Sequence, residues 1–378
     1  MFGGSSAQAS YQVRDTARCL TALEGDTDRN RFVAGSCLLR GNNELHVLEF
    51  NEDTNEVWCQ NVFSHPHEIW QCTTCPAPEH SELVCTTHAT NGEMRVKLWR
   101  MEGVADAPPV SDAVGAPAVP AAAPLPEVLQ LGAGVPMKEH LGVVWNAVLP
   151  EQIVSMTRKR LSLHTLTHGA RASTAAESAF APPPAEDTTF SCGRWDPHHA
   201  HSLAVGCASG ALVAMDTRTM KAAHSVQAAH SQKVRGIDYN PNKPYVALSC
   251  GDDYYVRYWD LRKPDEPLLA TKAHAHWVTC ALYNRFHDQL VLSSGTDNAV
   301  KLWRATSISS APAMADADDP ELTEAEADGL VKSFDDHEQS VFAAAWSAAD
   351  AWIFASLSTD GKAVINHVPP AEKYKILL

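Results

Sequence analysis

The stretch Ser249-Cys250-Gly251-Asp252-Asp253-Tyr254-Tyr255-Val256-Arg257-Tyr258-Trp259-Asp260 decides the fold, because two later segments repeat its pattern. The second copy is Ser293-Ser294-Gly295-Thr296-Asp297-Asn298-Ala299-Val300-Lys301-Leu302-Trp303. The third and most divergent copy is Ser356-Leu357-Ser358-Thr359-Asp360-Gly361-Lys362-Ala363-Val364-Ile365-Asn366. Each copy follows a histidine that lies four residues before a valine, and these pairs are His230/Val234, His274/Val278 and His337/Val341. The chain therefore contains an internal repeat. The tryptophans of its first two copies, Trp259 and Trp303, are 44 residues apart.

This spacing falls within the period of about 40–45 residues that is typical of WD40 repeats, each of which forms one four-stranded blade of a β-propeller. In such a blade the tryptophan lies on the third strand, and a turn aspartate precedes it by six residues. The His, Ser or Thr, Asp and Trp side chains hydrogen-bond to one another and so satisfy polar groups that would otherwise be buried without partners. We therefore interpret the repeat residues as structural and not as an active site. They are His230, Asp253, Trp259, His274, Asp297, Trp303, His337 and Asp360.

The position of the repeat tryptophan can be followed along the whole chain. It falls at Leu48, Trp99, His164, Met215, Trp259, Trp303 and Asn366. Alternating apolar residues around these positions predict half-buried strands. The sequence thus predicts an all-β protein, a single seven-bladed WD40 β-propeller over residues 11–378. We expect residues around Tyr11–Leu20 to pair into the last blade and close the ring, which removes an exposed sheet edge, and residues 1–10 to form a disordered tail.

Three segments lengthen the repeat, and we expect each to be a flexible insertion between blades. Residues 102–127 and 168–187 are rich in alanine and proline, and residues 305–333 are acidic. Because insertions in repeats map to loops, all three could crowd one side of the disc. The acidic segment is either a spacer or a docking loop for a partner. The docking hypothesis rests on Asp316, Asp318, Asp319 and Glu321.

The bulk composition narrows the classes of partner. The chain has 378 residues, a formal net charge of −15 and an isoelectric point near 5.6. Such an acidic surface argues against nonspecific binding to nucleic acid, which needs basic groups for the phosphates. The N-terminal residues lack the apolar core of a signal peptide, no stretch has the ~20 apolar residues of a membrane span, and the cysteines show no disulfide framework. We expect a cytoplasmic protein.

Candidate chemical sites are few. Cys72-Thr73-Thr74-Cys75, followed by Cys85 and His88, resembles a zinc-ligand pattern, but cysteines on extended strands would point to opposite faces. The histidine clusters His65-Pro66-His67 and His198-His199-Ala200-His201 are more typical of turns between the first and second strands of a blade, or of the positions before the first strand, than of metal sites. No nucleophile elbow, zincin motif, Walker loop or dinucleotide fingerprint is present. We therefore expect neither a metal, nor a cofactor, nor an enzymatic activity.

Tyr258-Trp259-Asp260-Leu261-Arg262 contains a W-D-x-R element. It resembles the motif by which some WD40 proteins dock onto the DDB-type adaptor of cullin-4 ubiquitin ligases. Because Trp-Asp belongs to the repeat itself, only Arg262 adds information. We keep Asp260 and Arg262 as a candidate adaptor-docking pair.

Residues outside the repeat motif are more specific. The chain resembles the EARP- and GARP-complex-interacting protein family (an older name is tumour-suppressing subtransferable candidate protein), strongly from about residue 189 onward and in patches such as Glu68-Ile69-Trp70 before it. Blade 3 departs most, with Arg158 and His164-Thr165 where the family keeps an aspartate and Trp-Asp. The matching stretches are Gly193-Arg194-Trp195-Asp196-Pro197-His198-His199, Asp238-Tyr239-Asn240-Pro241-Asn242-Lys243-Pro244-Tyr245, Tyr283-Asn284-Arg285-Phe286-His287-Asp288-Gln289-Leu290, Asp336-His337-Glu338-Gln339-Ser340-Val341, residues 346–358, Asn366-His367-Val368-Pro369 and Lys373-Tyr374-Lys375-Ile376-Leu377-Leu378.

The resemblance implies a non-catalytic adaptor, monomeric by itself, that binds subunits of the EARP and GARP tethering complexes. It also implies peripheral association with the trans-Golgi network and endosomes through those partners, in support of endosomal recycling, retrograde transport and secretory-granule cargo sorting. Two alternatives stay open. One is a substrate receptor of a cullin-4 ligase that uses Asp260 and Arg262, and the other is a histone- or chromatin-binding acidic propeller, although no nuclear-import cluster is present.

Overall fold

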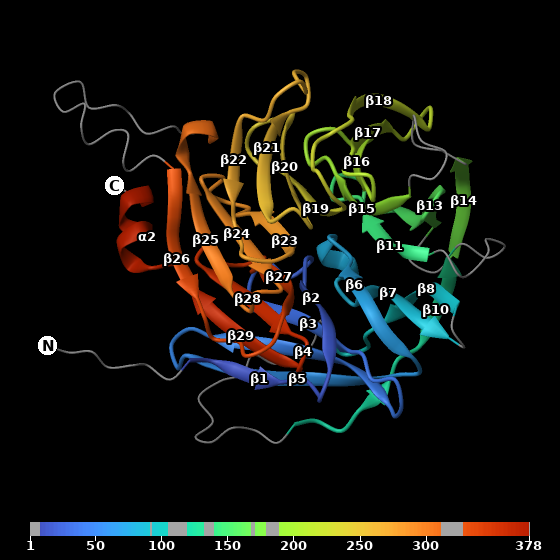
Figure 1. Ribbon diagram of the computed structural model, residues 1–378. Helices are drawn as coiled ribbons and strands as arrows, with labels where there is room; N and C mark the ends of the chain where they lie inside the picture. The colour runs from blue at the N-terminus through green and yellow to red at the C-terminus, as the bar shows by residue number, and fades with distance from the viewer. Residues whose placement is uncertain are drawn as a thin grey trace, which may run out of the picture.

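Seven β-sheets surround a central axis in the computed structural model, which describes residues 8–90, 93–104, 119–131, 140–167, 171–178, 189–310 and 328–377 (Figure 1). Six sheets have four strands and one has five. Each sheet is one blade of the ring, and its four main strands pair antiparallel, whereas the short fifth strand of the larger sheet pairs parallel. The structure confirms the predicted seven-bladed β-propeller.

The inner strand of each blade lies nearest the axis and packs against the inner strands of the neighbouring blades. The inner strands of blades 1 to 7 are β2 (Ala17–Ala22), β6 (Glu68–Thr74), β11 (His140–Trp145), β15 (Phe190–Trp195), β19 (Val234–Tyr239), β23 (Val278–Tyr283) and β27 (Val341–Trp346). The second strands are almost entirely buried, because both of their faces lie against neighbouring blades. They are β3 (Asn30–Ser36), β7 (Leu83–Thr90), β12 (Gln152–Thr157), β16 (Ser202–Cys207), β20 (Val246–Gly251), β24 (Leu290–Gly295) and β28 (Ile353–Ser358).

The third strands carry the position of the repeat tryptophan. They are β4 (Asn43–Asn51), β8 (Glu93–Arg100), β13 (Leu161–Thr167), β17 (Leu212–Asp216), β21 (Tyr255–Asp260), β25 (Val300–Ala305) and β29 (Lys362–His367). The outer strands form the rim of the disc. They are β5 (Glu56–His65), β10 (Glu127–Leu131), β14 (Arg171–Ser178), β18 (Lys221–Val226), β22 (Leu269–Lys272), β26 (Asp328–Phe334) and, in blade 7, β1 (Ser10–Gln12).

The register of the second and third strands is the same in all seven blades. In each blade, the third-strand residue at the tryptophan position pairs with one residue of the second strand. That second-strand residue lies two positions before the position that carries the Ser or Thr of the repeat. The pairs are Leu48↔Phe32, Trp99↔Val84, His164↔Ile153, Met215↔Leu203, Trp259↔Ala247, Trp303↔Val291 and Asn366↔Phe354. The divergent blades therefore keep the strand pairing after losing the tryptophan.

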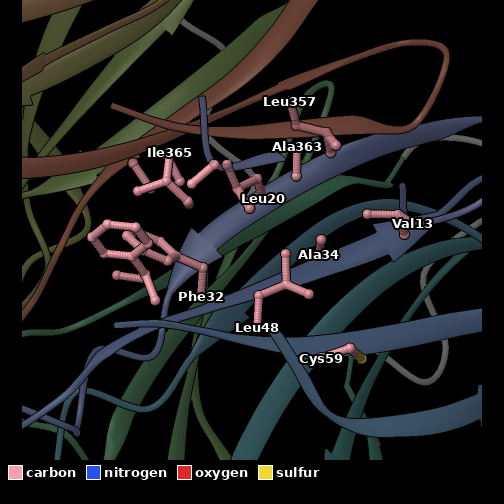
Figure 2. Packing of buried hydrophobic residues seen from close by; sticks show 14 of the residues in the cluster. Val13, Leu20, Phe32, Ala34, Leu48, Cys59, Leu357, Ala363 and Ile365 are labelled. Atoms are coloured by element: carbon pink, nitrogen blue, oxygen red, sulfur yellow. The ribbon is translucent and has the colours of Figure 1, made fainter. Parts of the chain in front are cut away.

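The N-terminal strand closes the ring, as the sequence predicts, but with a shorter segment. Only β1 pairs with β29 of the last blade, from Ser10↔Val364 to Gln12↔Lys362. Residues 17–22 form the inner strand of blade 1 instead, because their buried side chains pack on Phe32 and Leu48 of that blade. Figure 2 shows side chains from the two ends of the chain meeting in this shared core, where Leu20 and Phe32 face Leu357 and Ile365.

The expected tail and insertions also need narrower bounds. Ala9 is buried and the Gln8 side chain donates to Asn366, so the residues from 8 onward belong to the fold because blade 7 binds them. Two of the expected insertions contain the outer strand of a blade, β14 in 168–187 and most of β26 in 305–333. The insertion 102–127 contains the short β9 (Ala123–Pro124), which pairs with β5, and the first residue of β10. Propensity alone missed these strands, which gain their hydrogen bonds from an adjacent strand.

The remaining parts of those insertions, residues 105–118, 168–170, 179–187 and 311–327, lie outside the described residues. The expectation that the insertions crowd one side of the disc falls on these residues. Along the chain, residues 105–118, 168–170 and 311–327 precede the outer strands β10, β14 and β26, and residues 179–187 follow β14.

The family-like tail forms α2 (Pro370–Leu377), which packs against blades 6 and 7. Glu372 is buried and forms a bidentate ion pair with Arg304 of β25, and Lys373 lies over the Trp352 ring at 5.2 Å. Leu378 lies outside the described residues. In the part of the chain that the structure describes, none of the helices is both long enough and apolar enough to cross a membrane.

A set of short polar residues caps the turns that follow five inner strands, and we call it the turn belt. Each member is buried, follows an aromatic residue and accepts two backbone N–H groups of its own turn, as Asn284 does from Phe286 and His287 at 2.9 Å each. The belt residues are Asn146, Asp196, Asn240, Asn284 and Ser347.

The turn belt also joins each blade to the next. The Asn284 amide donates to Ala351 O of blade 7 at 2.6 Å, and the Ser347 hydroxyl donates to Asn30 of blade 1 at 2.6 Å. Equivalent links run from Asn146 to Ala200 O, between His198 and Asn240 O, and from Asn240 to Asp288. One end of the central channel is therefore held by a nearly continuous hydrogen-bonded belt from blade 3 to blade 1.

Candidate functional site

The repeat residues of blades 5 and 6 form closed polar sets inside the blades. In blade 5, His230 Nδ1 lies 2.8 Å from Asp253, and its Nε2 lies 2.7 Å from Ser249 Oγ. Trp259 Nε1 donates to the same hydroxyl at 2.9 Å. In blade 6, His274, Asp297, Ser293 and Trp303 make the same three contacts. Burial would raise the pKa of Asp297, but its hydrogen bonds with His274 and the Ala275 N–H lower it to about 2.

Blade 7 differs from this pattern at Asp360. His337 contacts two hydroxyls, Ser356 and Ser358, at 2.8 Å each, and Ser358 in turn donates to Asp360. Ser358 holds the place of Gly251 and Gly295, where a side chain would come close to the repeat histidine. The inserted hydroxyl therefore separates His337 from Asp360, which are not in direct contact as His230 and Asp253 are.

Two further blades keep part of the set without the full motif. In blade 2, His65 Nε2 lies 3.1 Å from Thr86 Oγ1, to which Trp99 Nε1 donates at 2.8 Å. In blade 3, His164 replaces the tryptophan and its Nε2 lies 2.8 Å from Ser155 Oγ. His65 stands before its inner strand, one of the two places expected for the histidine clusters, but it is not among the repeat residues predicted from the sequence.

The cysteine and histidine candidates are separated by the fold. Cys72 packs in the core between blades 1 and 2, whereas Cys75 and Cys85 pack between blades 2 and 3. His88 stacks on His67, and His199 bonds to Asp196. Within the described ranges, no group of three His, Cys, Asp or Glu residues is arranged to hold a metal. All ten cysteines are free thiols.

The W-D-x-R element places a forked ion pair at the end of β21. Arg262 Nε and Nη2 donate to Asp260 at 2.9 and 2.7 Å, and the guanidinium lies over the Tyr245 ring. The neighbouring blade repeats this arrangement, since Arg218 donates to Asp216 at the end of β17. Both arginines are exposed. The acidic candidates Asp316, Asp318, Asp319 and Glu321 lie outside the described residues.

The sequence reading missed a different feature, a β-bulge near the start of every inner strand. In each blade the register with the second strand shifts by one residue, which leaves one inner-strand residue unpaired. Such bulges redirect a side chain. We call the seven bulge residues the mouth ring, because they surround the end of the channel opposite the turn belt. They are Arg18, Trp70, Leu141, Ser191, Arg235, Thr279 and Phe342.

Two members of the mouth ring hydrogen-bond to the neighbouring blade, and one of them, Thr279, also bonds to Ser294 of its own blade. Ser191 Oγ donates to Val234 O at 2.6 Å, and Thr279 Oγ1 donates to Val341 O at 2.6 Å. Of the two aromatic members, Trp70 is the more exposed and keeps 38% of its surface accessible. Trp277, which precedes β23, is equally exposed beside the ring.

Arg18 lies between two aromatic side chains of the mouth ring. Its guanidinium carbon is 4.6 Å from the centre of the Trp70 ring and 4.4 Å from that of Phe342. Burial lowers the pKa of Arg18, and the positive charge of Arg235 lowers it further. Among the described residues, no carboxylate, carbonyl or hydroxyl accepts a hydrogen bond from this guanidinium. A partly buried cation without an acceptor is costly.

Arginines at the other end of the channel have acidic partners. Arg194 Nε lies 2.8 Å from Asp238, and Arg285 forms an ion pair with Glu24. In the mouth ring itself, Arg235 donates to Asp252 and lies over the Trp277 ring at 4.9 Å. Arg18 differs from these arginines, because its guanidinium has no acidic partner among the described residues.

Comparison with known proteins gives two family matches. The model described as EIPR1 beta-propeller matches residues 5–303, and the one described as WD domain, G-beta repeat matches residues 329–365.

Full-length relatives are similar along nearly the whole chain. EARP and GARP complex-interacting protein 1 of Homo sapiens is 33% identical over 396 residues, with 98% of this chain and 99% of that protein covered. The EARP-interacting protein homolog of Gekko japonicus is 33% identical with the same coverage. WD repeat-containing protein DWA2 of Arabidopsis thaliana is 30% identical over 377 residues, again covering 98% and 99%.

Proposed function

Because the chain belongs to the EIPR1 β-propeller family, we propose that it is a non-catalytic adaptor that binds EARP and GARP complexes. The names of several relatives state this interaction for those proteins. A rigid propeller suits the role, since its loops and blade ends can contact several partners at once.

The observation that carries the proposal is the Arg18 guanidinium between Trp70 and Phe342, which lacks an acceptor in the described part of the chain. Arginine and tryptophan dominate the energetics of many protein interfaces. The mouth ring is therefore the docking face that we assign to the tethering complex. The interior repeat residues, from His230 to Asp360, support the blades and have no direct part in binding.

In the cell, the adaptor would support recruitment of these complexes to endosomal and trans-Golgi membranes, in recycling, retrograde transport and secretory-granule cargo sorting. Membrane association would be indirect, through the bound complex. The protein would act as a single propeller, monomeric until it meets its partners.

The test is affinity purification of the tagged chain from mildly lysed cells. The wild-type protein should recover the subunits shared by the two complexes. The double variant Trp70→Ala/Phe342→Ala should lose them while its melting temperature stays near that of the wild type. Arg218→Ala, on an outer edge of blade 4, is the control that should still recover them. If the wild type recovers no tether subunit, the proposed function is wrong.

The acidic stretch with Asp316, Asp318, Asp319 and Glu321 is a second candidate contact. If it docks onto a basic partner, changing Asp318 and Asp319 to lysine should weaken recovery most at low salt, because exposed charges are screened as salt rises. If recovery is unchanged at every salt concentration, the stretch is a spacer.

One observation favours the cullin-4 alternative enough to test it. The Asp260–Arg262 fork and its copy Asp216–Arg218 lie on adjacent blades, with both guanidiniums exposed. A substrate receptor should co-purify with the ligase adaptor, and Arg262→Ala should reduce that recovery. Unchanged adaptor recovery in the double variant Arg218→Ala/Arg262→Ala would remove this alternative.

A further inference from the structure

The mouth ring and its surroundings carry a concentration of positive charge on an otherwise acidic chain. Arg18 and Arg235 belong to the ring, Lys233 precedes the bulge of β19, and Arg158 lies in the turn between β12 and β13. The whole chain has a net charge of −15. We call these four residues the basic arc.

We propose that the mouth ring binds an acidic segment of a partner chain, whose carboxylates meet Arg18 and Lys233 and whose apolar side chains pack on Trp70 and Trp277. This inference rests on the proposed function and adds the chemistry of the partner to it.

Arg18 sets the first requirement on the ligand. The guanidinium carbon lies over both the Trp70 and the Phe342 ring, and an acceptor binds a guanidinium at its edge, where the N–H groups point. A carboxylate meets that edge with two parallel hydrogen bonds. Such a bond gains strength in a site from which water is partly excluded.

Lys233 sets the second requirement. Its side chain is partly buried, and its ammonium has no hydrogen-bond or ion-pair partner among the described residues. Burial lowers the pKa of Lys233 and the positive charge of Arg235 lowers it further, whereas the Asp252 carboxylate raises it. Asp252, the acid beside it, is already held by two N–H groups of Arg235. The arc thus has more positive charge than its own acids neutralise.

The shape of the site favours a peptide over a membrane surface. Arg18, Lys233 and Arg235 are each partly buried at the mouth of a channel, whereas binding to anionic lipid relies on basic groups that project from the surface. Trp70 and Trp277 offer exposed rings from two different blades, on which apolar side chains between the acids can pack. An extended segment can reach both rings and both cations.

The experiment measures direct binding of a fluorescent peptide in which glutamate alternates with leucine, by anisotropy with the purified full chain. The wild type should bind it, and affinity should fall as salt rises. A peptide with glutamine in place of glutamate should bind much more weakly. Arg18→Gln and Lys233→Gln should each weaken binding about tenfold, whereas Arg218→Gln, with the same loss of charge elsewhere, should bind as the wild type does. Melting temperatures check that each variant folds.

Four results would overturn the inference: no binding of the acidic peptide, equal binding of the glutamine peptide, unchanged affinity in both arc variants, or binding of phosphatidylserine vesicles that competes with and exceeds binding of the peptide. If Arg18→Gln fails to fold, the affinity of Lys233→Gln for the acidic peptide decides whether the inference holds. Failure here is distinct from failure of the proposed function. If only the acidic-peptide inference is wrong, the wild type still recovers the tethering complexes. If only the proposed function is wrong, the peptide binds but the complexes are not recovered.

Discussion

The two ends of the central channel have the same repeated backbone but carry different kinds of side chain. At one end, the turn belt places a short polar residue after the inner strand of five successive blades, and every member is buried and hydrogen-bonded. At the other end, the mouth ring places one bulge residue in each of seven blades, and its members are cationic, aromatic, aliphatic or hydroxylic.

The difference shows how to separate support from recognition in a repeat protein. A position that repeats the same chemistry in blade after blade and satisfies its own polar groups serves the fold, as Asn240 and Asn284 do. A position that repeats only its backbone geometry is free to vary its side chain. The mouth ring is of the second kind, and there Arg18 has no acceptor of its own.

Acidification should have the largest effect on stability. It should destabilise the strands near the mouth ring more than the turns of the turn belt. Burial lowers the pKa of His65 and His337 to about 4 and that of His88 to about 3, and all three lie toward the mouth. An unfolded histidine binds protons near pH 6.5, so stability is full above that pH and falls as pH drops toward 4. Each histidine should cost about 2 kcal/mol by pH 5.

Chemical denaturation across this pH range measures the effect, and hydrogen exchange shows where opening begins. His88→Gln should flatten the pH dependence, whereas His224→Gln, on the exposed part of β18, should not change it. Stability that stays constant from pH 7 to pH 5 would contradict the prediction. If amide hydrogens in the turns of the turn belt exchange earlier than those in the strands near the mouth ring, the predicted order of opening is wrong.

Trp259→Ala should have the next largest effect, because it removes a buried ring that lies between the two ends. We expect a loss of about 3–5 kcal/mol in the free energy of unfolding, as for other large-to-small core substitutions. The Ser249 hydroxyl would also lose its tryptophan donor. Urea denaturation measures the loss, and Trp277→Ala serves as the control at an exposed tryptophan. A similar loss in both variants would mean that the exposed ring supports the fold.

The propeller could be predicted from the sequence because the repeat motif along the chain and the strand pairing in the blades have the same period. Even Met215 and Asn366 could be aligned, since neighbouring apolar residues preserve the alternation. The bounds of the insertions were less predictable. β14 and β26 lie within segments of biased composition, and such edge strands depend on pairing with a formed neighbour more than on their own residues.

The candidate site was harder to predict from one sequence. An aromatic residue followed by Asn, Asp or Ser recurs in blades 3 to 7, as in Trp145-Asn146 and Tyr283-Asn284, and this pattern could have identified the turn belt. The mouth ring has no such signal, because its residues share a backbone bulge and not a residue type. Arg18, Trp70 and Phe342 meet only when the ring closes, so no spacing along the chain could have placed them together.

Asn284→Ala tests the belt directly. It removes the acceptor of two N–H groups and the donor to Ala351 O, so we expect a loss of about 2–3 kcal/mol in the free energy of unfolding. Asn284→Ser should recover part of this, because Ser347 caps the equivalent turn in blade 7. Denaturation of the three proteins gives the comparison. Equal stability of the alanine and wild-type proteins would show that the belt does not support the fold.

Trp70→Ala should have the smallest effect on stability and a large effect on binding. Its ring is exposed and contributes mainly the contact with Arg18, which is worth about 0.5–1 kcal/mol at an exposed site. Melting temperature and recovery of tether subunits should be measured on the same preparation, with Asn284→Ala alongside. If Trp70→Ala lowers stability as much as Asn284→Ala does, the mouth ring supports the fold as the belt does. A drop in recovery at nearly constant melting temperature would separate the two ends, because only a surface used for binding can be lost without loss of the fold.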